Sequence, residues 1–198
     1  MTPEFKGPKW YISPCGGSTV NEGSVTAPLA HISGAYDKAA SGDTLVLLKG
    51  THSGSNNRGF SWDENDKPMV VMGDPSYVAD STIIDAGGKD RHFYFSGGDS
   101  IFQIIGLTLY NGQSSDGGSV YVSHTGTKPI FKNVLFKGNS ATGNNYHGGG
   151  AVMINSAGPA FYDCRFEGNT RIVEDTEHAR GGATVSYTHL TLPTILLV

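Results

Sequence analysis

The amino-acid sequence predicts an all-β chain, a right-handed parallel β-helix (solenoid) with a short N-terminal capping α-helix. Glycine accounts for 28 of the 198 residues and charged residues for 16%, which indicates short apolar strands joined by frequent tight turns. A segment near residue 130 recurs about 30 residues later, and such a period with strand-like alternation is typical of stacked strand coils. One stretch near the N-terminus has apolar residues at helical spacing.

The first elements form the expected cap. Residues 11–14 predict a short strand, and a helix is expected between Pro28 in its first turn and Gly42 at its C′ position, with apolar residues at Leu29, Ile32, Tyr36, Ala39 and Ala40. Such a helix would cover the exposed apolar cross-section and open strand edges at the start of a solenoid. Further strands are expected at 44–48, 69–73, 81–86 and 92–95.

The repeats predict the body of the solenoid. Residues 129–140 (PIFKNVLFKGNS) and 159–170 (PAFYDCRFEGNT) align without gaps, and residues 104–112 form a weaker earlier copy. We expect Phe131 to stack on Phe161, and Phe136 on Phe166, inside the coil. Asn139 and Asn169 are expected at a turn, where asparagine tolerates unusual φ and ψ and where stacked amides can hydrogen-bond along the axis.

A second marker recurs at 117–120, 149–152 and 181–183, where a Gly-Gly pair precedes Ser-Val or Ala-Val and, in the last copy, Ala183. The glycines permit a corner with positive φ and a close approach of backbones. Together with Phe136-Lys137-Gly138-Asn139 and Phe166-Glu167-Gly168-Asn169, this marker resembles the repeat of bacterial polymorphic outer-membrane proteins, although Ser119 departs from its alanine. That resemblance implies a surface-displayed β-helix.

The N-terminal stretch contains, in one order, Tyr11, Ser13, Pro14, Gly16, Asn21, Gly23, Ser24, Pro28, Ile32, Ala39, Gly42, Asp43, Thr44, Gly50 and Thr51. In these residues it resembles the opening module of bacterial extracellular pectin-lyase-like proteins. This resemblance implies a right-handed β-helix located outside the cell or on the outer-membrane surface.

The expected organisation has three parts. Residues 1–9 form an N-terminal extension, and residues 10–183 form the β-helix domain, with its cap at 10–51 and its rungs at 60–183. Residues 184–198 are expected to be a non-native tail, because codons for residues 185–190 (VSYTHL) resemble a translated transposon-end sequencing adaptor. The domain would then be truncated after residue 183. The alternative is a genuine terminal strand, since the tail is rich in β-branched and apolar residues.

Composition excludes several classes of function. A net charge of −4 provides no basic patch for nucleic acid, and no apolar run is long enough to span a membrane.

Cys15 and Cys164 lack metal-ligand spacing, and their separation does not decide whether they pair. They are interpreted as two unpaired small hydrophobic residues. Residues 85–92 (DAGGKDRH) form a polar cluster that is interpreted as a solvated turn.

The candidate binding surface lies in the loops before the Gly-Gly corners, because these loops vary in length while the ladders keep their spacing. Its residues are Asp116, Tyr146, His147, Glu174, Asp175, Glu177, His178 and Arg180. Tyr146 could stack on a sugar, and the acids could bind sugar hydroxyls or calcium, the one cofactor considered. No catalytic motif and no metal-ligand motif occurs, so neither a catalytic residue nor a metal ligand is assigned.

These observations favour a secreted or cell-surface β-helix module without catalytic activity, either adhesin-like or glycan-binding. Its expected partner is a polysaccharide or a cell-surface glycan of a host. The alternative is the N-terminal part of a carbohydrate-active enzyme, a polysaccharide lyase, hydrolase or epimerase, because fold alone does not decide function.

Overall fold

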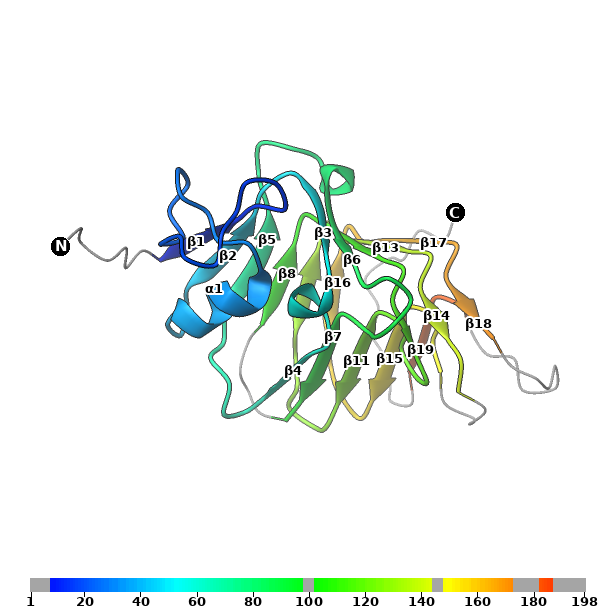
Figure 1. Ribbon diagram of the computed structural model, residues 1–198. Helices are drawn as coiled ribbons and strands as arrows, with labels where there is room; N and C mark the ends of the chain where they lie inside the picture. Colours follow the sequence, from blue (N-terminus) through cyan, green and yellow to red (C-terminus); the bar gives the residue numbers. More distant parts are fainter. Residues whose placement is uncertain (1–7, 98–101, 144–147, 173–181, 187–198) are drawn as a thin grey trace.

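A computed structural model describes residues 8–97, 102–143, 148–172 and 182–186 of the chain. Its strands wind through successive turns, and equivalent strands of neighbouring turns lie side by side and pair in parallel (Figure 1). The predicted fold, a right-handed parallel β-helix with one short helix at its N-terminal end, is confirmed. Two short 3-10 turns, η1 (Ser55–Asn57) and η2 (Ala79–Ser81), interrupt the connections.

Four parallel sheets form the walls of the described coil. Sheet A contains β1 (Lys9–Ile12), β2 (Thr44–Leu47), β5 (Val70–Gly73), β8 (Gln103–Ile105), β12 (Ile130–Lys132) and β16 (Ala160–Tyr162). Sheet B contains β3 (Gly50–Ser53), β6 (Thr82–Asp85), β9 (Thr108–Tyr110), β13 (Leu135–Lys137) and β17 (Arg165–Glu167). Sheet C contains β4 (Phe60–Asp63), β7 (Phe93–Ser96), β11 (Val120–Ser123), β15 (Val152–Asn155) and β19 (Thr184–Ser186). The shorter sheet D contains β10 (Gln113–Ser114), β14 (Ser140–Ala141) and β18 (Thr170–Arg171).

The helix α1 (Ile32–Lys38) is shorter than the sequence predicts. The predicted start at Pro28 is wrong because Leu29 is held in extended backbone: its N–H donates to Tyr11 O at 2.8 Å, and its own carbonyl accepts from Ser13 N–H at 2.9 Å. The predicted end at Gly42 is also wrong, because the backbone is already extended at Ala39. The helix packs on β1, β2 and η1, and so covers the first rung as expected (Figure 1).

Aromatic rings stack along the interior. Phe131 lies opposite Phe161 with ring centroids 5.0 Å apart, and Phe136 lies opposite Phe166 at 4.7 Å with nearly parallel planes. These are the pairs that the repeat alignment predicts. The rings of Phe131 and Phe136 are completely buried, and burying one such side chain contributes about 1.5–3 kcal/mol.

A ladder of amides runs parallel to the rings. Asn139 Nδ2 donates to Asn169 Oδ1 at 2.9 Å and to Leu109 O at 3.0 Å, while Asn139 Oδ1 accepts from Gly112 N–H at 2.7 Å. Asn169 Nδ2 makes the equivalent bond to Phe136 O at 2.8 Å. The ladder therefore joins each asparagine to the backbone of the neighbouring turn.

The prediction that these asparagines adopt unusual backbone angles is wrong. The positive φ values belong to the preceding positions: 61° at Gly138, 59° at Gly168 and 55° at Asn111 in the earlier turn. The reason is a division of roles. The preceding residue makes the turn, which leaves the asparagine side chain directed inward to bond the carbonyl of the neighbouring rung.

His92 begins the ladder in place of an asparagine. Gly112 occupies the position equivalent to Asn139, and a Cβ there would lie 3.0 Å from the His92 ring. His92 Nε2 donates to Ile84 O at 3.0 Å and to Tyr110 O at 3.2 Å, and Ile84 is in register with Leu109. The His92 imidazole thus bonds Ile84 O, the carbonyl that an asparagine side chain at residue 112 would otherwise reach.

Close backbone contacts at Gly118 and Gly150 explain why a Gly-Gly pair recurs at regular spacing in this chain. A Cβ on Gly118 would lie 2.3 Å from Ser140 O and 2.4 Å from Gly150 O. A Cβ on Gly150 would lie 2.1 Å from Gly182 O. Only glycine lets these three backbones approach, so the predicted close approach is observed.

Candidate functional site

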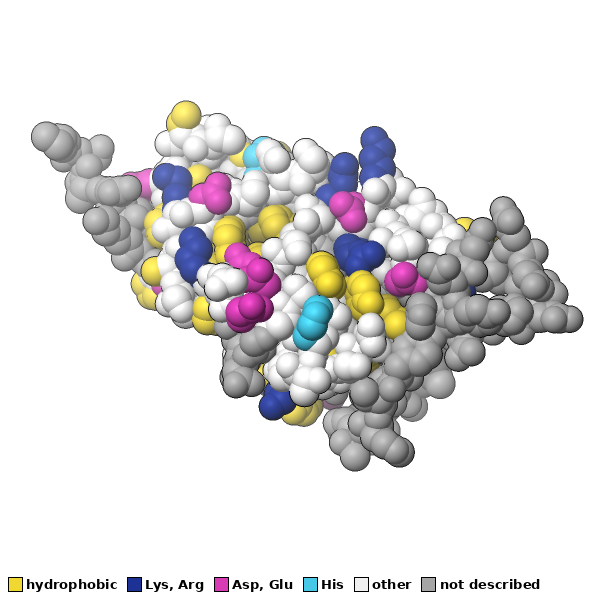
Figure 2. All heavy atoms as spheres, turned by 90° about the horizontal axis from the view of Figure 1, so that it is seen from below, with side chains coloured by type: hydrophobic (Ala, Val, Ile, Leu, Met, Phe, Trp, Pro, Cys, Tyr) yellow, Lys and Arg dark blue, Asp and Glu magenta, His cyan; other side chains and the backbone are white. Residues whose placement is uncertain are grey.

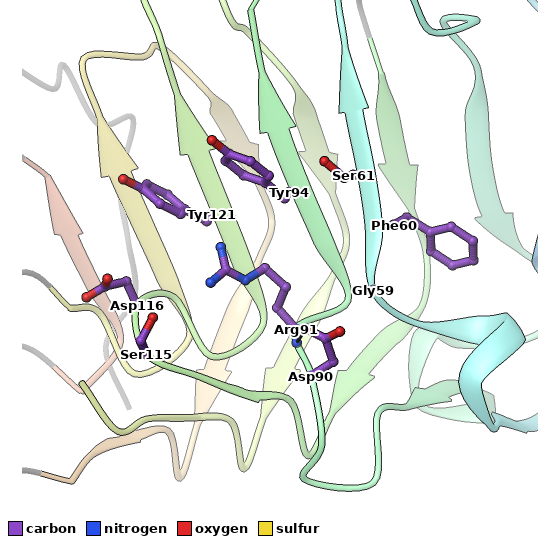
Figure 3. A pocket seen from close by; sticks show the side chains of 9 residues that line it. All are labelled: Gly59, Phe60, Ser61, Asp90, Arg91, Tyr94, Ser115, Asp116 and Tyr121. Carbon is purple, nitrogen blue, oxygen red and sulfur yellow. Dashed lines mark hydrogen bonds between the residues drawn. The ribbon is translucent and has the colours of Figure 1, made fainter.

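One of the eight predicted surface residues, Asp116, lies within the described part of the chain. Tyr146, His147, Glu174, Asp175, Glu177, His178 and Arg180 lie outside the described residues. Asp116 follows β10 and lines an open hollow of about 420 Å³ on the outer face of sheet C. The hollow is lined by Gly59, Phe60, Ser61, Asp90, Arg91, Tyr94, Ser115, Asp116 and Tyr121 (Figure 3). Seen from below, the molecule carries hydrophobic side chains near its middle with basic and acidic groups beside them (Figure 2).

Two tyrosines form one wall of the hollow. Tyr94 on β7 and Tyr121 on β11 are in register, and their ring centroids are 5.2 Å apart with planes inclined by 30°. Tyr94 OH is 3.1 Å from Ser123 Oγ, and Tyr121 OH accepts from Asn155 Nδ2 at 3.3 Å. Because alternate residues of a strand face opposite sides, the buried neighbours Phe93 and Phe95 direct Tyr94 outward. Each ring is therefore fixed at its backbone by a paired strand and at its hydroxyl by a hydrogen-bond partner.

Arg91 lies beside both rings. Its guanidinium carbon is 5.7 Å from the Tyr94 centroid and 5.2 Å from the Tyr121 centroid, within the range of cation–π attraction. Nε and Nη2 donate to Ser114 Oγ at 3.2 and 2.5 Å. Burial lowers the pKa of Arg91, and the charges of Asp90 and Asp116 act in the opposite direction. The side chain thus remains a fixed cation between two carboxylates.

The two carboxylates differ in their surroundings. Asp116 Oδ1 is buried and has no hydrogen-bond partner among the described residues. Asp90 is exposed, and its Oδ1 accepts from the Arg91 backbone N–H at 2.7 Å. Its Oδ2 lies over Gly59, where a Cβ would be 2.8 Å away and φ is 71°. Glycine at residue 59 therefore gives the Asp90 carboxylate its place at the rim of the hollow.

The interpretation of residues 85–92 as a solvated turn is wrong at its end. Asp90 is exposed, but Arg91 is half-buried and His92 is completely buried. Burial lowers the pKa of His92 to about 4, so the ring is neutral. Since Nε2 donates to carbonyls, Nδ1 accepts from Ser119 Oγ at 3.0 Å. His92 is structural, whereas its neighbour Arg91 lines the hollow.

Arg91, Tyr94 and Tyr121 are not among the binding residues that the sequence predicts. A signal was present, because the runs His92–Phe95 (HFYF) and Ser119–Val122 (SVYV) both place tyrosine third, and the second run overlaps a Gly-Gly marker. Among the described residues no group of three or more His, Cys, Asp or Glu side chains could hold a metal ion. In the same part of the chain, no helix is long and apolar enough to cross a membrane.

No protein-family model and no curated protein matches the chain. Among solved structures, a rhamnogalacturonan lyase resembles it with a TM-score of 0.39 and 17% sequence identity. The match covers 81% of this chain and 51% of the lyase, so the chain spans about half the length of that protein. A likeness at this level concerns the fold, and any functional assignment depends on the geometry of the hollow.

Proposed function

We propose that this chain is part of a glycan-binding β-helix protein and that a polysaccharide segment binds in the hollow on sheet C. The observation that carries the proposal is the combination of two adjacent tyrosine rings, a fixed arginine and a buried carboxylate oxygen that has no partner among the described residues. We propose binding without catalysis, and secretion or surface display is part of the same proposal. The resemblance of the N-terminal residues to extracellular proteins supports that location.

The chemistry of the hollow supports a sugar ligand. Tyrosine offers an apolar ring face with a polar tip, which matches the apolar faces and hydroxyl edges of a pyranose. Binding sites commonly combine such an apolar surface with a small number of placed polar groups. Arg91 and Asp116 supply a donor and an acceptor, and Arg91 does not need to reorganise, because the tyrosines and Ser114 already hold its guanidinium.

The test is binding of soluble polysaccharides and oligosaccharides by calorimetry, with a Tyr94→Ala variant. We expect Tyr94→Ala to lose binding, and Tyr162→Ala to retain it, because Tyr162 is exposed on sheet A away from the hollow. Equal binding by both variants would remove the hollow as the site. Release of shorter oligosaccharides during the incubation would favour the alternative, a carbohydrate-active enzyme.

A further inference from the structure

The outward column of sheet C contains a gap one side chain wide. In register along the coil stand Ser61 on β4, Tyr94 on β7 and Tyr121 on β11. Tyr121 packs against one side of Tyr94, with ring centroids 5.2 Å apart and planes inclined by 30°. On the other side the column continues with Ser61, which is small and exposed, and which lines the hollow together with Gly59. The Tyr94 ring therefore has one face covered by tyrosine and one face directed to the hollow.

The height of the gap is set by the strands. Neighbouring parallel strands lie about 4.8 Å apart, so the space beside Tyr94 is the space that a third stacked ring would occupy. Inside the coil the equivalent places are filled by rings, as with Phe60, Trp62 and Phe93. Outside, Ser61 leaves the place open. A flat ring from a ligand would complete the column.

The charges around the gap disfavour an anionic ring. Asp90 and Asp116 carry two formal negative charges, and Arg91 carries one positive charge that both carboxylates already face. The Arg91 guanidinium is also engaged by Ser114 and by the two tyrosine rings. A ligand carboxylate would therefore meet a site with a net negative charge, whereas hydroxyl groups would find acceptors in the carboxylates.

We infer that the ligand is an uncharged sugar, stacked on the open face of Tyr94 above Ser61, with a hydroxyl donated to Asp90, whose carboxylate lies over Gly59 at the same end of the hollow. This inference rests on the proposed function and adds the substrate class and the seat of the ring.

The experiment uses matched pairs of oligosaccharides: a glucan and a mannan, each beside its uronate form with the same linkage. Calorimetry on the whole chain at low and moderate salt measures each affinity. We expect at least one neutral form to bind about tenfold or more tightly than its uronate. In Asp116→Asn the preference should shrink, because one negative charge is removed while Arg91 remains.

Two variants at residue 61 test the seat of the ring. Ser61→Trp fills the gap with its own ring and should weaken binding of the neutral sugar by about tenfold or more, while Ser61→Ala should leave it within about twofold. Circular dichroism and the melting temperature establish that both variants are folded. If folded Ser61→Trp binds the neutral sugar with the original affinity, the ring does not lie above Ser61.

The outcomes separate the two proposals. Tighter binding of the uronates, with loss in Tyr94→Ala, would overturn the uncharged ligand and leave the glycan-binding function standing. Binding of neutral sugars that ignores both Tyr94→Ala and Ser61→Trp would overturn the hollow as the site. No binding by any of the four oligosaccharides would overturn the inference, and the broader polysaccharide panel would then decide the proposed function.

Discussion

Replacing Asn139 by alanine tests the amide ladder most directly. The side chain is completely buried, and its loss leaves the Gly112 N–H and the Leu109 carbonyl without this partner, while Asn169 Oδ1 still accepts from the Asn139 backbone N–H at 3.0 Å. The Leu109 carbonyl also belongs to the parallel ladder of β9 and β13, so the Gly112 N–H is the group left unsatisfied, and one such group predicts a loss of about 2 kcal/mol in the free energy of unfolding. For a chain of this size the melting temperature should fall by about 6 °C.

The assay is thermal and urea unfolding followed by circular dichroism, with two comparison variants. Asn169→Ala should cost less, because Asn169 is only partly buried. Asn65→Ala, in an exposed turn, should change stability by no more than about 0.5 kcal/mol. If Asn139→Ala melts within the range of Asn65→Ala, the ladder contributes nothing measurable and the reasoning fails.

Three further predictions concern single residues. Because burial lowers the pKa of His92 to about 4 from an unfolded value near 6.5, its neutral form contributes stability that is present above about pH 6.5 and lost as the pH falls toward 4. The loss amounts to about 3 kcal/mol, and melts of His92→Asn across this range should show a shallower dependence on pH. Gly118→Ala should destabilise the fold strongly, because its Cβ would lie 2.3 Å from a backbone oxygen. The Cβ of Gly34→Ala in α1 would meet nothing within 4 Å, so this variant should stabilise the fold by up to about 1 kcal/mol. The urea midpoints of the two variants measure the difference. Cys15 is exposed, and burial raises the pKa of Cys164 to about 11, so a thiol reagent at neutral pH should label Cys15 first, as peptide mass mapping would show. Equal labelling, a neutral Gly118→Ala, or identical pH profiles would contradict the respective prediction.

Most of the coil could be predicted because its constraints repeat along the chain. Phe136 and Phe166, and Asn139 and Asn169, stand at the same places in two aligned segments, and stacking follows from that period. The helix boundaries could not be predicted in the same way. Leu29 has the right spacing for a helix, but its backbone pairs with Tyr11 and Ser13, which the local pattern does not contain.

The candidate site was harder to predict because its residues share no local motif. Tyr94 and Tyr121 look like ordinary strand residues, and only the parallel register brings their rings together. The predicted binding residues lie in loops of variable length, and of those residues the structure describes Asp116 alone. Arg91 has polar neighbours in the sequence, which predict a solvated turn, although the turn places its side chain against the tyrosines.

The amide ladder also constrains how such a gene can lengthen or shorten. Each asparagine bonds a carbonyl about one repeat away: Asn139 reaches Leu109 and Asn169 reaches Phe136. A duplication whose breakpoints lie between equivalent positions copies donor and acceptor together, and every new buried amide inherits a partner. A duplication out of phase would leave donors facing the wrong residues inside the coil. Insertions and deletions of whole turns should therefore preserve the fold, and the position of the asparagine in each turn shows whether a duplication is in register.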